Sequence, residues 1–258
     1  MATGATTFLR DSTIVFRRQI RMNLRNPVWV LIGVLQPIMY LLLFGPLLKP
    51  LVSQFPGGAE NAYTFLVPGL LVQLGLFGAL FAGFSLIGEW REGVIEAERV
   101  TPASRTALLT GRLMRDMLQL LVQAVILVLL GWAMGMRGSV AGVIVGIVIT
   151  LLVGGACAAA SNALALTTKS EDVMAPVINM VMMPVLLLSG ILLPMTLGPT
   201  WLRRLSDFMP FRWIVDGVRD TFGGELATTA VLWALLASVI LAALGTWWGT
   251  AVFRKENA

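Results

Sequence analysis

The sequence predicts an all-α protein that crosses a membrane six times. Hydrophobic residues make up 57% of the 258-residue chain and charged residues only 13%. Apolar runs of about twenty residues recur from Val28 onward, and each is long enough to cross about 30 Å of hydrocarbon. A soluble protein of this size could not bury so many apolar side chains, so lipid must cover the remainder. We therefore expect residues 1–258 to form a single membrane domain.

The first predicted element is an amphipathic helix over residues 8–26. At about 100° per residue its arginines fall within an arc of roughly 100°, opposite most of the apolar side chains. The arginines of this arc are Arg10, Arg17, Arg18, Arg21 and Arg25. The pattern is typical of a helix that lies on a membrane surface, with its arginines among phosphates or against an acidic partner.

Two spans follow this interfacial helix. Pro27 ends it, because proline disfavours helix in the residue before it and is welcome in the first turn of the next helix. The first span is therefore expected over 28–48. A short connection that contains prolines and glycines separates it from a second span over 64–87.

The most charged segment of the chain is 88–116, where we expect the side chains to lie in water as a loop. Thr101 and Pro102 are typical of an N-cap followed by proline at the first helical position. A short helix should give way there to one that continues into the third span, 117–136. The segment is either a solvated connector or a rigid knob whose charges dock a partner.

The remaining spans are predicted over 140–166, 173–193 and 227–253. Between the last two, residues 194–226 mix tryptophan and phenylalanine with arginine. We interpret this segment as amphipathic helices that partly re-enter the membrane surface. Glycines four residues apart, such as Gly245 and Gly249, favour close packing between spans.

The distribution of Lys and Arg predicts the orientation of the chain. Thirteen of these residues fall on the side of the two termini and of 88–116, and six on the other side. Cytoplasmic loops carry the excess of positive charge, so both termini should be cytoplasmic. Because the first long apolar run begins only near Val28, no cleaved signal peptide is expected and the N-terminus should be retained.

Composition excludes several classes of function. The chain has no His and a single cysteine, Cys157, so zinc sites, serine hydrolase triads and internal disulfides are not expected. No Gly-rich loop ends in Gly-Lys-Ser/Thr, so the chain should not hydrolyse ATP by itself. The net charge of +5 is explained by orientation in the membrane rather than by nucleic acid. Intramembrane chemistry with Ser or Asp pairs stays open.

Polar groups inside the spans are neutral. No predicted span carries Lys, Arg, Asp or Glu near its middle, which argues against ion-coupled transport. Most of the neutral groups should bond across helices. The candidates for contact with a transported molecule are Gln36, Gln73, Asn179 and Ser189.

Two segments resemble a known family. The run GEWREGVIEAERVTPASRTALLTGRLMRD (88–116) resembles the cytoplasmic loop of ABC-2 type permeases, the membrane subunits of ATP-driven exporters that include the daunorubicin-resistance permeases. The run MPVLLLSGILLPMTLGPTWLRRLSDFMPFRWIVDGVRD (183–220) is similar to the family's fifth span and the segment after it. With the interfacial helix and six spans, the resemblance covers nearly the whole chain and implies the type V exporter fold.

The resemblance also implies partners and roles. The stretch 89–99 would be a coupling helix held in a groove of an ATPase subunit, through Glu89, Arg91, Glu92, Gly93, Glu96 and Arg99. Residues 194–226 would be external re-entrant helices. Two permease chains would enclose a pathway lined mainly by the first, second and fifth spans, with one ATPase bound to each. ATP and Mg would bind to the ATPases, and this chain would bind no cofactor.

The resulting prediction is the permease subunit of a bacterial cell-membrane exporter. Its cargo would be a hydrophobic or amphipathic molecule (a drug, lipid or glycolipid), because the route is apolar with few fixed charges. One alternative is a membrane scaffold that recruits a cytoplasmic partner and moves nothing. A second alternative is an intramembrane enzyme that acts on lipid.

Overall fold

The structure, a computed structural model, describes residues 4–25, 28–50, 61–94 and 105–255. Every regular element within these ranges is helical. In chain order they are α1 (Gly4–Arg25), α2 (Val28–Leu48), α3 (Ala62–Leu80), α4 (Ala82–Arg91), α6 (Arg105–Ala133), α7 (Val140–Thr168), α8 (Glu171–Leu188), the 3₁₀ turn η2 (Met195–Leu197), α9 (Thr200–Asp207), α10 (Pro210–Phe222) and α11 (Thr229–Lys255).

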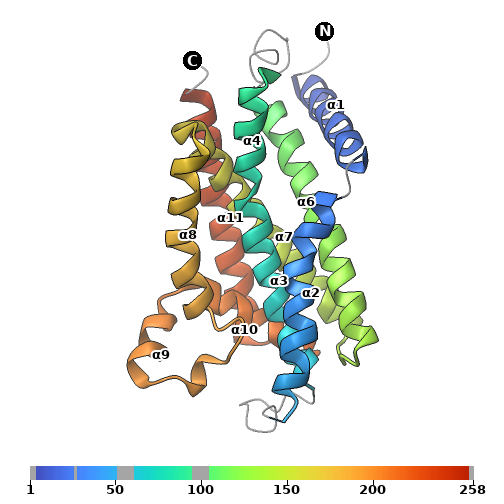
Figure 1. Ribbon diagram of the computed structural model, residues 1–258, viewed down its shortest axis with the longest axis vertical. Helices are drawn as coiled ribbons and strands as arrows, with labels where there is room; N and C mark the ends of the chain where they lie inside the picture. The colour runs from blue at the N-terminus through green and yellow to red at the C-terminus, as the bar shows by residue number, and fades with distance from the viewer. Residues whose placement is uncertain (1–3, 26–27, 51–60, 95–104, 256–258) are drawn as a thin grey trace.

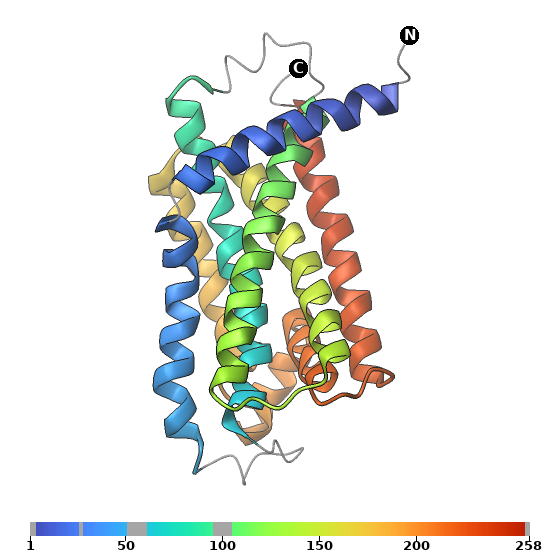
Figure 2. The ribbon, with the colours of Figure 1, turned by 90° about the vertical axis from the view of Figure 1, so that its right-hand side faces the viewer.

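Six segments of the described chain are long and apolar enough to cross a membrane, which confirms the prediction. They are Leu31–Leu48, Ala62–Arg91, Ala107–Ala133, Val140–Thr168, Glu171–Leu188 and Thr229–Val252. The segments run side by side as one bundle (Figure 1). Helix α1 crosses the end of the bundle at which α4 and α11 terminate, whereas α9 and α10 lie at the opposite end (Figure 1, Figure 2).

Helix α7 lies at the centre of the bundle and contacts α3, α4, α6, α8, α10 and α11. Small residues allow the closest of these contacts. A Cβ atom on Gly245 of α11 would lie 2.5 Å from the carbonyl oxygen of Ala156, and one on Gly249 would lie 3.1 Å from that of Ala159. The predicted role of this glycine pair in close helix packing is confirmed.

The second span is broken at Phe81, where we expected one continuous helix over 64–87. The hydroxyl of Ser161 on α7 donates to the carbonyl of Leu80 and accepts from the N–H of Gly83 at 3.0 Å. A side chain that inserts into the helical hydrogen-bond ladder in this way separates the two halves. The result is a joint between α3 and α4. No side chain at Gly83 would fit, since its Cβ would lie 2.4 Å from Met174 and 2.5 Å from the Ser161 carbonyl.

The fifth span is shorter than the predicted 173–193. Helix α8 ends at Leu188, and Gly190 adopts the left-handed conformation with φ of 72°. Glycine takes this conformation without steric cost, so the chain turns before Pro194. The chain then forms η2, α9 and α10 within the segment predicted to be amphipathic helices.

Candidate functional site at the charged end of the bundle

A cluster of charged side chains lies where α1, α4 and α6 meet (Figure 2). Its centre is Glu89, near the end of α4. Arg112 and Arg115 approach from α6, and Gln19 approaches from α1. Both arginines are buried, with Arg112 2% and Arg115 8% exposed. The cluster therefore joins three helices that lie far apart in the sequence.

Glu89 uses both of its carboxylate oxygens. Its Oε2 accepts hydrogen bonds from Nε and Nη2 of Arg112, at 3.1 and 2.8 Å. Its Oε1 accepts from Nε2 of Gln19 at 2.9 Å and lies 3.9 Å from Nη1 of Arg115. Bonds between ionised partners are stronger than neutral ones, and burial of the pair strengthens them further. Glu89 thus holds α4 to both α6 and α1.

Arg115 completes the network. Its Nη1 donates to Oε1 of Gln19 at 3.0 Å, and its Nη2 donates to the Ser85 hydroxyl at 3.2 Å. Its Nε and Nη2 donate to Oδ1 of Asp116 at 2.9 and 2.7 Å. The amide of Gln19 therefore bridges Glu89 and Arg115 by donating to one and accepting from the other. Among the described residues of the cluster, two guanidinium groups face two carboxylates, so the formal charges of these four groups balance.

This burial shows that the prediction of a fully solvated 88–116 loop was wrong. Arg112 and Arg115 are buried on α6, which continues from Arg105 into the third span as expected, whereas the predicted cap at Thr101 and Pro102 lies outside the described residues. An isolated charge is too costly to bury, but opposite charges that hydrogen bond to one another offset much of that cost. Balanced pairing is the reason that this part of the segment can enter the bundle.

A second set of contacts ties α4 to the turn between α7 and α8. Nη1 of Arg91 lies 3.1 Å from Oε1 of Glu171, at the start of α8. The ammonium of Lys169 lies 4.4 Å from the ring centroid of Trp90. Both partners of the ion pair are largely exposed, at 59% and 41%, so this pair is weaker than the buried one.

The residues predicted to form a coupling helix separate into two groups. Glu89 faces the cluster, where Arg112 binds it, whereas Arg91 and Glu92 are exposed. Gly93 turns the chain after α4, with φ of 72°. Two further predicted residues, Glu96 and Arg99, lie outside the described residues. The structure thus divides the predicted site into an inner anchor and an outer surface.

Helix α1 turns its arginines away from the bundle. Arg10, Arg17, Arg18 and Arg21 are exposed, and the side chain of Arg25 lies outside the described part. The opposite side packs on α6 through Ser12, Val15 and Gln19. A Cβ atom on Gly111 of α6 would lie 2.8 Å from Val15 and 2.9 Å from the carbonyl of Ser12. Contact of the arginines with a membrane surface stays a prediction.

The four residues proposed to line a substrate path differ in exposure in this single chain. Gln36 on α2 and Asn179 on α8 are exposed, and Gln36 donates to the Tyr40 hydroxyl at 3.4 Å. Gln73 on α3 is 1% exposed, and within the described residues neither polar atom of its amide has a hydrogen-bond partner. Ser189 is fully buried and donates to the carbonyl of Leu186.

The opposite end of the bundle holds a largely buried arginine of another kind, with 14% of its side chain exposed. Nη2 of Arg219 on α10 donates to the carbonyls of Gly190 and Ile191, at 2.7 and 3.0 Å. Its guanidinium carbon lies 3.9 Å from the ring centroid of Phe65 on α3. Nη1 lies 3.6 Å from a carboxylate oxygen of Asp216. Arg219 thus fixes α10 to the turn that ends α8.

Sequence reasoning missed Gln19, Arg112, Arg115 and Asp116 as members of a site. One signal was available: Ser12 and Gln19 are polar residues seven apart on the otherwise apolar side of α1, where they face a partner helix. The pairing of Gln19 with Glu89 had no such signal, because the two residues lie 70 positions apart in the sequence.

The fold and the charged cluster define a multi-pass helical membrane protein whose charged end is built from three helices. The family model for the ABC-2 type transporter matches residues 11–223. The chain belongs to the ABC-2 type transporter family and is a transport permease.

Named relatives agree with this family. The chain is 26% identical to the daunorubicin resistance ABC transporter permease protein DrrB1 of Streptomyces coeruleorubidus, over 90% of this chain and 82% of that protein. It is 25% identical to the "Putative transport permease ycf38" of Cyanophora paradoxa, over 82% of this chain and 74% of that protein. The protein of the same name from Porphyra purpurea is 26% identical, over 76% and 68%.

Proposed function

We propose that this chain is the permease subunit of an ATP-driven exporter and that a separate ATPase drives it from the charged end of the bundle. The observation that carries this proposal is the anchoring of α4 by Glu89. The exposed end of α4, with Arg91 and Glu92, projects from a helix whose inner face is bonded to α1 and α6. Force applied to that end of α4 would be transmitted to α1 and α6 through the cluster.

The joint at Phe81 supports this route for mechanical work. Helix α4 is separated from α3 by the inserted hydroxyl of Ser161, so it can tilt without bending a continuous helix. The cluster on one side and the Arg91–Glu171 pair on the other connect α4 to α1, α6 and α8. In the proposed complex the ATPase contacts 89–99, Glu96 and Arg99 included.

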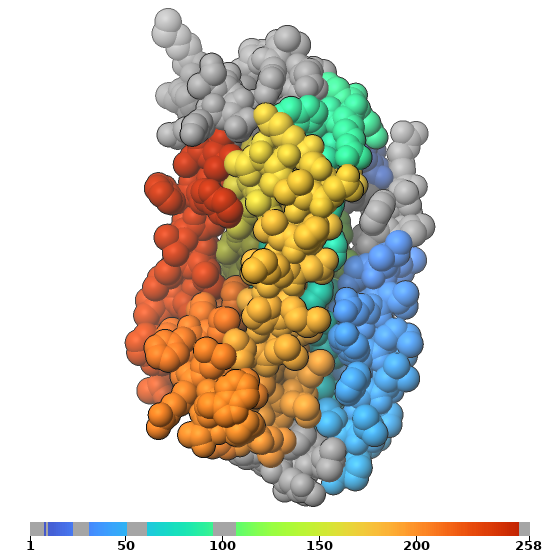
Figure 3. Space-filling model, turned by 60° about the vertical axis from the view of Figure 1, so that its left-hand side comes forward, coloured from blue at the N-terminus to red at the C-terminus, as the bar shows by residue number. Residues whose placement is uncertain are grey.

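Two copies of the chain would enclose the pathway. Helices α2 and α8 lie on the surface of the bundle (Figure 3), and each exposes apolar side chains, for example Leu43 at 62% and Met180 at 81%. Faces of this kind suit a second membrane-embedded copy. Gln36 and Asn179 are exposed on the same two helices, which is where a shared pathway would present them.

The proposed orientation places α1, the end of α4 and the end of α11 in the cytoplasm, because Lys and Arg are in excess on that side. The proposed cargo is hydrophobic or amphipathic. Two observations support this choice: the exposed span surfaces are apolar, and the relative DrrB1 is named for daunorubicin resistance.

The proposal is tested by purifying the chain in mild detergent together with the proteins expressed beside it. We expect an ATPase to copurify in a ratio of two to two and to hydrolyse ATP in the complex. Reconstituted vesicles should then move daunorubicin or a fluorescent phospholipid only when ATP is present. Recovery of the chain alone, or with a partner that lacks ATPase activity, would contradict the proposal.

The scaffold alternative shares the docking surface but predicts a different result. A scaffold would bind its partner through the outer face of α4 and would show no cargo-dependent stimulation of ATP hydrolysis. An exporter should hydrolyse ATP faster when daunorubicin or the phospholipid is added. The intramembrane enzyme alternative predicts conversion of lipid by the chain alone, without ATP.

A further inference from the structure

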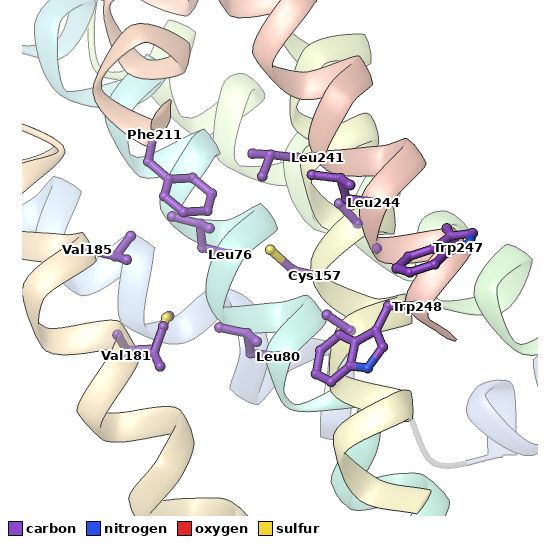
Figure 4. Close-up of a pocket in the computed structure, with 14 residues that line it drawn as sticks. Leu76, Leu80, Cys157, Val181, Val185, Phe211, Leu241, Leu244, Trp247 and Trp248 are labelled. Carbon is purple, nitrogen blue, oxygen red and sulfur yellow. The ribbon is translucent and has the colours of Figure 1, made fainter. Parts of the chain in front are cut away.

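An apolar crevice of about 370 Å³ opens between α8 and α11. The two helices stand apart on this side of the bundle, and α7 is visible behind them (Figure 3). The floor of the crevice is made by α3 and α7, through Leu76, Leu80 and Cys157. Phe211 of α10 closes one end of the crevice (Figure 4). Neither the charged cluster nor any of the four residues proposed for a substrate path lines this crevice.

The chemistry of the walls is uniform. The 14 lining residues are apolar, apart from the thiol of Cys157 and the indole N–H groups of Trp247 and Trp248. Water gains few hydrogen bonds in such a space, so filling it with water costs free energy. The occupant that suits the walls is a hydrocarbon.

The crevice opens toward the lipid. Its rim includes Val181 on α8, 55% exposed, and Leu244 on α11, 56% exposed. Both residues belong to membrane-spanning segments, so the opening lies at the depth of the acyl chains rather than of water. A lipid chain can therefore enter sideways from the bilayer.

Two tryptophans mark one end of the crevice as an interface. Trp247 and Trp248 lie near the end of α11, on the side of the charged cluster, and both border the crevice (Figure 4). Tryptophan is enriched at the boundary between hydrocarbon and headgroups, and its indole N–H is a donor. A lipid whose chain lies in the crevice would place its ester and headgroup near this end.

We propose that the crevice between α8 and α11 binds an acyl chain of a phospholipid from the leaflet next to α1 and the charged cluster. The volume of about 370 Å³ favours this occupant over a protein segment, because a transmembrane helix about 10 Å across and about 30 Å long needs several times that space. Such a site fixes the separation of α8 from α11. Binding here requires no ATPase and does not depend on the proposed transport function.

The test uses the full chain in lipid nanodiscs that contain a phosphatidylethanolamine with a diazirine in the middle of one acyl chain. After illumination, mass spectrometry maps the labelled residues. We expect labelling to concentrate on Cys157, Leu244 and Val181, several-fold above Val239, which is 52% exposed on α11 but does not line the crevice. Uniform labelling of the exposed helix faces would overturn the proposal.

A matched pair of variants sharpens the result. Ala160→Trp fills the crevice from α7 and should reduce labelling of Leu244 several-fold. Val239→Trp adds the same side chain outside the crevice and should leave that labelling unchanged. Absence of crevice labelling in the wild type would mean that another occupant, such as a second copy or a retained cargo molecule, covers it, and would overturn the proposal without any variant. Displacement of the label by daunorubicin would overturn it in favour of a cargo site.

Discussion

The two ends of the molecule bury arginine in different ways. At the charged end, Arg112 and Arg115 are balanced by carboxylates on α4 and α6. At the opposite end, Arg219 donates to backbone carbonyls and lies over an aromatic ring, and its ion-pair partner among the described residues, Asp216 of its own helix, lies 3.6 Å away. Side chains hold three helices together at the first end, whereas at the second a side chain holds a turn of the main chain.

The difference indicates different mechanical roles. Ion pairs between separate helices leave the backbone of each helix free to move, and the joint at Phe81 isolates α4 further. Bonds to the carbonyls of Gly190 and Ile191 fix the backbone after α8 itself. We therefore expect the charged end to transmit movement and the opposite end to act as a rigid closure. The following substitutions test that contrast.

The largest loss of stability is expected for Glu89→Ala. It removes the carboxylate that binds Nε and Nη2 of Arg112, a residue 2% exposed, and breaking a buried pair from one side costs ~3–5 kcal/mol. Thermal unfolding of the detergent-solubilised protein measures the loss. The control is Glu92→Ala, which removes an exposed carboxylate three residues away and should leave the melting temperature almost unchanged. Equal melting temperatures for the two variants would contradict the anchoring role of Glu89.

The next effect is expected for Arg219→Met, which keeps much of the aliphatic length but removes the donors to Gly190 and Ile191. Hydrogen bonds from a charged group contribute ~1.5–3 kcal/mol. Limited proteolysis of the segment between α8 and α10 should become faster, because α10 is no longer fixed there. Arg204→Met, at an exposed position on α9, should leave the digestion rate unchanged. Equal digestion rates for the two variants would contradict the role of Arg219 in fixing α10.

A somewhat smaller effect is expected for Gly83→Ala at the joint. Its Cβ would lie 2.4 Å from Met174 and 2.5 Å from the Ser161 carbonyl, and overpacking of this kind costs ~1–3 kcal/mol. Gly88→Ala is the matched control on the same helix, since nothing lies within 4 Å of its Cβ. That control should be neutral or stabilising, because alanine favours helix over glycine. Denaturant or thermal unfolding of the two variants separates the outcomes.

The smallest effect on stability is expected for Arg91→Ala. Exposed ion pairs contribute ~0–1 kcal/mol, so loss of the pair with Glu171 should hardly change the melting temperature. A loss as large as that of Glu89→Ala would show that the outer surface of α4 is structural and not available for docking.

The sequence predicted the architecture well because hydropathy is a local property. The first span was expected over 28–48, and α2 is Val28–Leu48, since an apolar run and Pro27 together define it. The break at Phe81 could not be predicted, because it depends on Ser161, about eighty residues away along the chain. The sequence around Phe81 is that of an ordinary apolar helix.

The sequence pointed to the exposed part of the candidate site but not to its buried part. The resemblance selected the end of α4, where Arg91 and Glu92 are exposed, and the docking of an ATPase there stays a prediction. It did not reveal that Glu89 faces inward, because the direction of a side chain depends on which helices pack around it. Charged residues within a predicted loop, such as Arg112, gave no sign of being buried pairs.

The measurement that tests the central claim most directly is the affinity of the copurifying ATPase for the chain in nanodiscs, compared between two charge reversals. Glu92→Lys alters the exposed end of α4, and Glu225→Lys makes the same change at an exposed position at the opposite end. If α4 is the docking surface, Glu92→Lys should weaken binding several-fold and Glu225→Lys should not. Unchanged binding in Glu92→Lys, or equal loss in both variants, would contradict entry of mechanical work through α4.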